Sequence, residues 1–213
     1  MGSVTAIDQR LYKASLPPIT VEHTDLVSLT PKSVANLVAT LSSGTRLGVA
    51  ATYGEKSVLD ALAFSTETRV LLITMNATSW KVAKRQKLIL MNKILCNVSL
   101  EKHGFFMERL AAALYLDLGL YIRNAFDITS DGDTRGSMAA YKNVLGRARV
   151  DTLYVSAVEH IFTEQPFILS RKTEFALRAW ASYVAVQALP DKPGVIDTSV
   201  PVKDPQACSA YHP

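Results

Sequence analysis

The chain has 213 residues and a net charge of +4 at pH 7; 48% of its residues are hydrophobic and 20% are charged. This balance is typical of one globular domain and excludes a wholly disordered chain. The two cysteines are too few for a disulfide framework or a cysteine-rich zinc site. No apolar run reaches the length needed to cross a bilayer, so no membrane is expected among the partners.

The mildly basic charge permits a nucleic-acid partner without requiring one. The segment Met1–Arg10 lacks the basic start and the apolar run of a secretory signal. We therefore expect an intracellular location, in the nucleus or the cytoplasm.

Periodicity divides the chain into three parts. Residues 1–29 show little periodicity and are predicted to form an extended lead-in, with one edge strand at Ile19–His23. Residues 30–190 alternate between helical and strand periods, which predicts the folded domain. Residues 191–213 are rich in proline, aspartate and serine, which indicates an exposed tail.

The first half of the domain begins with a helix. Thr30 is a good N-cap, Pro31 suits the first helical position, and apolar residues follow at helical spacing until Gly44. Three apolar runs separated by turn-forming residues then predict consecutive antiparallel strands. These runs are Arg46–Tyr53, Ser57–Ser65 and Arg69–Met75.

The second half alternates helix and strand before it becomes helical throughout. The pattern predicts a helix from Thr78 or Ser79 to Met91, a buried strand, an apolar helix ended by Gly119, and another strand. The buried strand is predicted at Ile94–Val98, the apolar helix at Phe105–Leu118 and the next strand at Tyr121–Ile128. Three further helices are predicted at Ser137–Leu145, Asp151–Phe162 and Ser170–Leu189. This order predicts a mixed α/β fold.

Four segments carry a resemblance to a known family. The first segment, Asp117–Asp127, contains Asp-Leu-Gly-Leu and ends in Asn-x-x-Asp. The second lies on the last predicted helix and contains Tyr183, Ala185 and Ala188. The other two segments are Gly48–Thr52 and Val58–Thr74. In this order, the segments resemble the DEDD-type 3′–5′ exonuclease domain of the RNase D and Werner-exonuclease group. The resemblance runs from Leu26 to Leu189 and implies a ribonuclease H-like mixed sheet, three antiparallel strands followed by two more, flanked by helices.

Those enzymes use four acidic side chains to hold two divalent ions, which activate water and stabilise the attacking and leaving oxygens. The resemblance places Ala50 and Thr52 at the first-strand acidic pair and Gln187 at the last-helix aspartate. The second acidic motif falls near Met107–Leu110, where Glu108 is the only carboxylate. One carboxylate cannot gather two divalent cations. We therefore expect no metal, no cofactor and no nuclease activity.

Tyr183 retains the position that orients the attacking water in the family. An aromatic residue on an alanine-rich helix is more often a packing residue, and we favour that role. The acidic cluster formed by Asp127, Asp131 and Asp133 is best explained by a strand-to-helix turn with capping residues.

Basic residues occur in two groups that could contact phosphates. For the first group we favour the alternative of an ordinary solvated helix face. The second group opens the last helix, where the helix dipole disfavours cations, and this favours an interaction role. The first group is Lys81, Lys84, Arg85 and Lys87, and the second is Arg171 and Lys172.

Three functional hypotheses follow. The first is a catalytically inactive exonuclease-like domain that serves as a protein-interaction scaffold or adaptor in RNA metabolism or RNA silencing, with protein partners or a second copy of the chain bound at apolar surface such as Tyr115. The second is a module that holds single-stranded RNA or DNA without cutting it. The third is an enzyme with a rebuilt site, either a metal-dependent nuclease or a different chemistry based on Asp117, Asp127 or Asp133.

Overall fold

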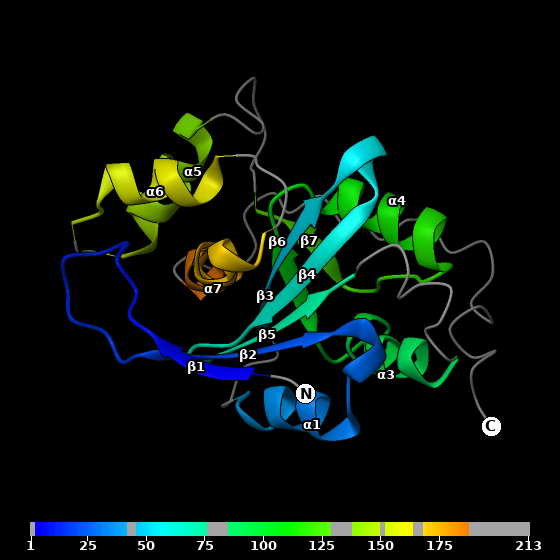
Figure 1. Ribbon diagram of the computed structural model, residues 1–213. Helices are drawn as coiled ribbons and strands as arrows, with labels where there is room; N and C mark the ends of the chain where they lie inside the picture. Colours follow the sequence, from blue (N-terminus) through cyan, green and yellow to red (C-terminus); the bar gives the residue numbers. More distant parts are fainter. Residues whose placement is uncertain are drawn as a thin grey trace.

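The computed structural model describes residues 3–41, 46–75, 85–128, 138–149, 152–163 and 168–187. These residues contain one mixed sheet of seven strands, in the order β1-β2-β5-β4-β3-β6-β7 (Figure 1). The strands are β1 (Ser3–Ile7), β2 (Ile19–Asp25), β3 (Arg46–Tyr53), β4 (Leu59–Ser65), β5 (Arg69–Thr74), β6 (Glu101–Gly104) and β7 (Ala125–Asp127).

Helices cover both faces of this sheet (Figure 1). One apolar core lies under α1, α3 and α4, and a second lies under α5, α6 and α7. The helices are α1 (Pro31–Ala39), α3 (Arg85–Leu95), α4 (Met107–Leu118), α5 (Met138–Ala148), α6 (Val155–Phe162) and α7 (Lys172–Gln187). The fold is therefore a three-layer arrangement with the sheet in the middle.

The pairing of the strands confirms the predicted mixed sheet. β3, β4 and β5 are antiparallel neighbours, while β6 and β7 continue the sheet parallel to β3. Parallel neighbours need a crossover connection, which α3 and α4 provide. The strand predicted at Ile19–His23 is confirmed as part of β2, which lies parallel to β5, but its predicted place at the edge of the sheet is wrong because β1 pairs with its other side. β1, which pairs with β2, was not predicted because its side chains are mostly exposed and show no apolar alternation.

The coverage of both faces explains why the central strands have continuous apolar runs instead of alternation. β4 and β5 are buried along most of their length. α7 is likewise surrounded by protein, and ten of its sixteen residues are buried. A helix that is apolar all round belongs in a core.

One predicted strand is wrong. Ile94 and Leu95, assigned by sequence to a buried strand over Ile94–Val98, form the end of α3 and pack with Leu90 and Met91 in the first core. Their spacing of four residues from that earlier pair is helical. The strand instead comes later, as β6, whose Lys102 and His103 gave no apolar signal.

Two helix boundaries agree closely with the sequence. Thr30 caps α1 by accepting a hydrogen bond from the Ser33 amide, and Pro31 is the first helical residue. Gly119 ends α4 with φ of 64°, the left-handed conformation that glycine adopts most easily. α4 begins two residues later than predicted, because Phe106 has left-handed backbone angles.

Within the described part of the chain, no helix is both long and apolar enough to cross a membrane. The tail at residues 191–213, Lys81 and Lys84 lie outside the described residues.

Candidate functional site

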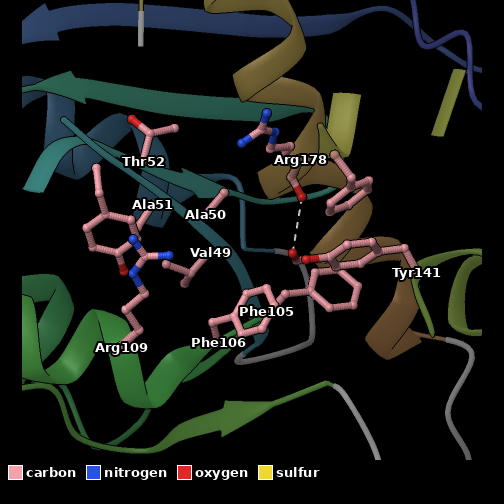
Figure 2. Close-up of a pocket in the computed structure, with 12 residues that line it drawn as sticks. Val49, Ala50, Ala51, Thr52, Phe105, Phe106, Arg109, Tyr141 and Arg178 are labelled. Carbon is pink, nitrogen blue, oxygen red and sulfur yellow. Dashed lines mark hydrogen bonds between the residues drawn. The ribbon is translucent and has the colours of Figure 1, made fainter. Parts of the chain in front are cut away.

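A cavity of about 240 Å³ lies at the carboxyl end of β3, which lies between β4 and β6 in the sheet. Helices approach it from both faces: α4 from one side, and α5, α6 and α7 from the other (Figure 2). Ligands of open α/β sheets commonly bind at the carboxyl ends of strands. The described lining residues are Val49, Ala50, Ala51, Thr52, Tyr53, Phe105, Phe106, Arg109, Tyr141, Phe162, Arg178 and Ser182.

β3 gives the cavity a wall of small side chains. Ala50 packs against the core under α7, and Thr52, on the same face of the strand, is 4% exposed. The Thr52 hydroxyl Oγ1 is buried and has no hydrogen-bond partner among the residues that the structure describes. Buried hydroxyl groups almost always have a partner, so this atom needs an explanation.

α4 contributes a cation at the opposite wall. The Arg109 guanidinium lies 4.0 Å from the centroid of the Tyr53 ring, a cation–π contact that fixes the side chain beside β3. Glu108, one residue earlier on the helix, is exposed and is not among the lining residues.

α7 contributes a second cation and a hydroxyl group. Arg178 donates hydrogen bonds to the carbonyl oxygens of Ile161 and Thr163, at the end of α6. The Ser182 hydroxyl donates to the Arg178 carbonyl at 3.1 Å (dashed in Figure 2). These contacts fix the Arg178 side chain beside the end of α6.

Aromatic rings close the remaining side. Phe105 packs edge-on against Tyr141 and Phe162, with ring centroids 4.7 and 5.3 Å apart. Tyr141 and Phe162 are stacked, with centroids 4.2 Å apart. These contacts join the start of α4 to α5 and α6.

The chemistry of the described walls does not suit a divalent cation. Magnesium and manganese require charged oxygen ligands, and no described lining residue is a carboxylate, whereas two are arginines. Nor do the described residues contain a group of three or more histidine, cysteine or acidic side chains that could hold a metal. Two guanidinium groups would also repel a divalent cation.

The structure separates the residues that the sequence placed together. Ala50 and Thr52 lie in this cavity, but Tyr183 and Gln187 line a second cavity of about 410 Å³, which also contains Arg46, at the opposite end of β3. Tyr183 is partly buried against the core under α7, and burial raises the pKa of its hydroxyl group.

Arg109, Arg178 and Ser182 are among the cavity residues that the sequence did not single out. Arg178 and Ser182 are four residues apart, the same spacing as the tyrosine and the aspartate in the family's last-helix pattern. That spacing alone could not identify the pair. It fits the Arg178–Ser182 pair as well as the Tyr183–Gln187 pair, and only the rotation of α7 distinguishes them.

The two described pairs of basic residues lie over opposite faces of the sheet. Arg85 and Lys87 belong to α3, and the Lys87 ammonium donates to the Leu29 carbonyl. Arg171 donates to Glu174 and to the His160 carbonyl, and Lys172 is partly buried. The contact with Glu174 explains how Arg171 is tolerated at the start of a helix, where the helix dipole disfavours a cation.

Two acidic residues of the Asp117–Asp127 segment have structural partners. The Asp117 carboxylate accepts a hydrogen bond from the Leu59 amide at 2.9 Å, at the start of β4. The Asp127 carboxylate accepts one from the Met107 amide at 2.9 Å, in the first turn of α4. Asp131 and Asp133 lie outside the described residues.

No protein-family model matches this sequence, and no curated protein is similar to it in sequence. Solved structures do match. RNase D from Trypanosoma brucei, in a complex with RNA U12, has a TM-score of 0.53 and 14% identity over 81% of this chain and 64% of its own. NrnC from Brucella melitensis has a TM-score of 0.50 and 15% identity over 78% of this chain and 79% of its own.

The catalytic core of RRP6 from Trypanosoma brucei has a TM-score of 0.51 and 17% identity, over 84% of this chain and 48% of its own. At these identities the similarity is one of fold. This chain therefore has the ribonuclease H-like fold of DEDD 3′–5′ exonuclease domains, and it spans less than two thirds of the RNase D chain.

Proposed function

We propose that this chain is an exonuclease-fold domain that does not hydrolyse phosphodiesters and acts by binding, as a protein-interaction scaffold or adaptor in RNA metabolism or RNA silencing. The observation that carries the proposal is the composition of the described cavity walls: Ala50, Thr52 and Ser182 with two arginines, and no carboxylate. Two-metal hydrolysis needs concentrated negative charge at that place, and these walls supply positive charge.

Exposed apolar side chains support the scaffold role. On α4, the Tyr115 and Leu116 side chains are 54% and 78% exposed, on the side of the helix away from its five residues buried in the first core. Large apolar side chains that a single chain leaves uncovered are typical of a binding surface.

Non-cleaving binding of single-stranded RNA or DNA is the second candidate. Its support is the pair of arginines at the cavity, together with the similarity in fold to an RNase D solved with RNA. The intramolecular hydrogen bonds of Lys87 and Arg171 weigh against a long phosphate track on the described surface.

The test of the first claim is a nuclease assay. The purified chain is incubated with 5′-labelled single-stranded RNA and DNA in Mg²⁺ or Mn²⁺, beside an active exonuclease as positive control. We expect no shortened products. Trimming from the 3′ end that is reduced by an Asp131→Asn or Asp133→Asn variant would contradict the proposal and indicate a rebuilt metal site.

The test of the scaffold role uses the exposed α4 side chains. Tagged wild-type chain and a Tyr115→Ser/Leu116→Ser variant are used to capture partners from native cells, with and without nuclease treatment. We expect nuclease-resistant partners that the variant loses. If every partner disappears after nuclease treatment, nucleic-acid binding is the better account. Sedimentation of the purified chain tells whether a second copy is the partner.

A further inference from the structure

We propose that two copies of this chain pair through β1, so that one continuous sheet runs through a symmetric dimer. The surface involved is the outer edge of β1 (Ser3–Ile7), the strand at one end of the sheet (Figure 1). The inference goes beyond the proposed function and is independent of it, because this edge involves neither the cavity at the end of β3 nor the exposed side chains of α4.

The register of the neighbouring strands shows which backbone groups of β1 face away from the sheet. The Thr20 amide of β2 donates to the Thr68 carbonyl at 2.8 Å, so the Thr20 backbone points toward β5 and away from β1. Ala6 lies opposite Thr20. Because opposed residues of an antiparallel pair alternate between bonded and non-bonded, the amide and carbonyl groups of Ala6 point outward. The same alternation turns the Val4 backbone outward.

These outward groups are the end of the hydrogen-bond ladder. Among the described residues, no strand or loop donates to or accepts from the outer edge of β1. The strand is exposed from Ser3 to Ala6, and Val4 is 63% exposed. A row of unpaired amide and carbonyl groups at a sheet edge is a template for one more strand.

β1 also lacks the features by which exposed edges usually avoid pairing, which are very short strands, charges, prolines and bulges. The opposite edge has this protection, because β7 has three residues and ends in Asp127. β1 has five residues, Ser-Val-Thr-Ala-Ile, with no charge and no proline, and it pairs with β2 without a register shift. Its β-branched residues favour an extended strand. The sheet therefore has one open edge and one protected edge.

A second copy of β1 fits this open edge in one register. Two antiparallel strands related by a two-fold axis at Thr5 place Val4 of each copy opposite Ala6 of the other. These are the residues with outward backbone groups, so they form the hydrogen-bonded pairs. Thr5 then lies opposite its own copy in a non-bonded pair, where side chains approach most closely. Threonine pairs in such positions stabilise strand pairing.

The symmetry limits the assembly to two copies. A two-fold contact uses the same surface on both copies, so the dimer occupies both open edges. The edges that remain belong to the two β7 strands, which are short and charged. We therefore expect a closed dimer instead of an open chain of copies. Because the contact is one pair of short strands, the dimer should be a small, transient interface that dissociates on dilution.

Sedimentation velocity of the full chain over a wide range of concentrations tests the inference. We expect the wild type to change from monomer to dimer as its concentration rises. Thr5→Lys changes an exposed side chain and places two like charges opposite each other at the two-fold axis. This variant should weaken the dimer roughly tenfold, and Thr5→Glu should have a similar effect. An equal mixture of the two variants should restore dimers, because opposite charges then face each other.

Two further variants separate the edge from other surfaces. Val4→Pro removes an amide that points away from β2, a position where an edge strand tolerates proline. It should weaken the dimer but leave the circular dichroism spectrum and the melting temperature of the monomer close to those of the wild type. Ala112→Lys adds the same charge as Thr5→Lys to the exposed face of α4 and should leave the dimer unchanged.

A wild type that stays monomeric at every concentration would overturn the inference. It would also be overturned by a dimer that Thr5→Lys and Val4→Pro leave intact, by one that Ala112→Lys weakens equally, or by mixed variants that do not recover. The nuclease assay is independent of these measurements. Trimming of RNA would contradict the proposed function and leave the dimer in place, whereas a monomeric chain that does not trim RNA would contradict only the pairing through β1.

Discussion

At the scale of single residues, Thr52 and Thr24 form a matched pair. Both side chains are 4% exposed, but the Thr24 hydroxyl donates to the Asp25 carbonyl at 3.2 Å, whereas the Thr52 hydroxyl has no partner within the described part of the chain. An unsatisfied buried hydroxyl costs free energy that a methyl group does not.

Thr52→Val should therefore raise the free energy of unfolding by about 1 kcal/mol in ligand-free buffer, and Thr24→Val should lower it by a similar amount. Urea denaturation of both variants beside the wild type measures the two changes. Equal losses of stability would show that the Thr52 hydroxyl is satisfied in solution.

Lys102 is a buried cation outside the cavity. It has no exposed surface, and its ammonium group donates to the carbonyl oxygens of Asn97, Leu100 and Arg123 at 2.6, 2.8 and 2.6 Å. Burial lowers the pKa of Lys102 from 10.5 to about 7. Between these two pH values the unfolded chain keeps a proton that the folded chain releases.

The free energy of unfolding should consequently rise with pH between about 7 and 10.5, because the unfolded state binds more protons there. The quantity to measure is the difference in pH slope between wild type and Lys102→Met, which removes the contributions of other groups. A difference of zero would mean that the three carbonyl groups keep the ammonium form in the folded chain.

At the scale of elements, the contact between β3 and α7 depends on Gly48. A Cβ atom at this position would lie 2.1 Å from the Ala179 carbonyl oxygen and 2.4 Å from the Tyr183 nitrogen, both backbone atoms. Backbone of a buried helix cannot give way as a flexible side chain can, so α7 must move if the glycine is replaced.

Gly48→Ala should lower the free energy of unfolding by about 3 kcal/mol, at the upper end of the cost of overpacking. Gly146→Ala is the control, because a Cβ there meets nothing within 4 Å. Gly146 lies inside α5, where alanine should instead raise the free energy of unfolding by roughly 0.5–1 kcal/mol. The melting temperatures of the two variants should move in opposite directions; a Gly48→Ala variant as stable as the wild type would show that α7 is not held against β3 as described.

The same contact explains how far the sequence could define the site. Strand period is two, so once β3 was recognised, Ala50 and Thr52 were assigned to the same face, and both line the cavity. α7 is apolar all round, so its sequence carries no phase that shows which residues face the cavity. Arg178 and Ser182 could be identified only after the helix was packed on Gly48.

At the scale of the whole molecule, the order of helical and strand periods was enough to predict the mixed α/β fold. Burial on both faces made the central strands visible as apolar runs. β6 was missed because its buried residues include Lys102 and His103, which are stabilised by specific hydrogen bonds and by stacking on Phe126 rather than by apolar character.

Surface charge provides the last prediction. The described basic pairs lie over opposite faces of the sheet, Arg85 and Lys87 on α3 and Arg171 and Lys172 at the start of α7. A single strand that passes over one face cannot reach the other pair, so few phosphates can be contacted at once.

Fluorescence anisotropy of a labelled single-stranded RNA, repeated over a range of salt concentrations, tests this arrangement. Each phosphate contact on a single strand contributes about −0.7 to the slope of log K against log salt. Two or three contacts predict a slope of about −1.4 to −2. Lys93→Gln serves as the control and should leave the slope unchanged. A slope of about −4 or steeper would require a continuous track of about six or more phosphate contacts, which would favour the nucleic-acid-binding function over the scaffold.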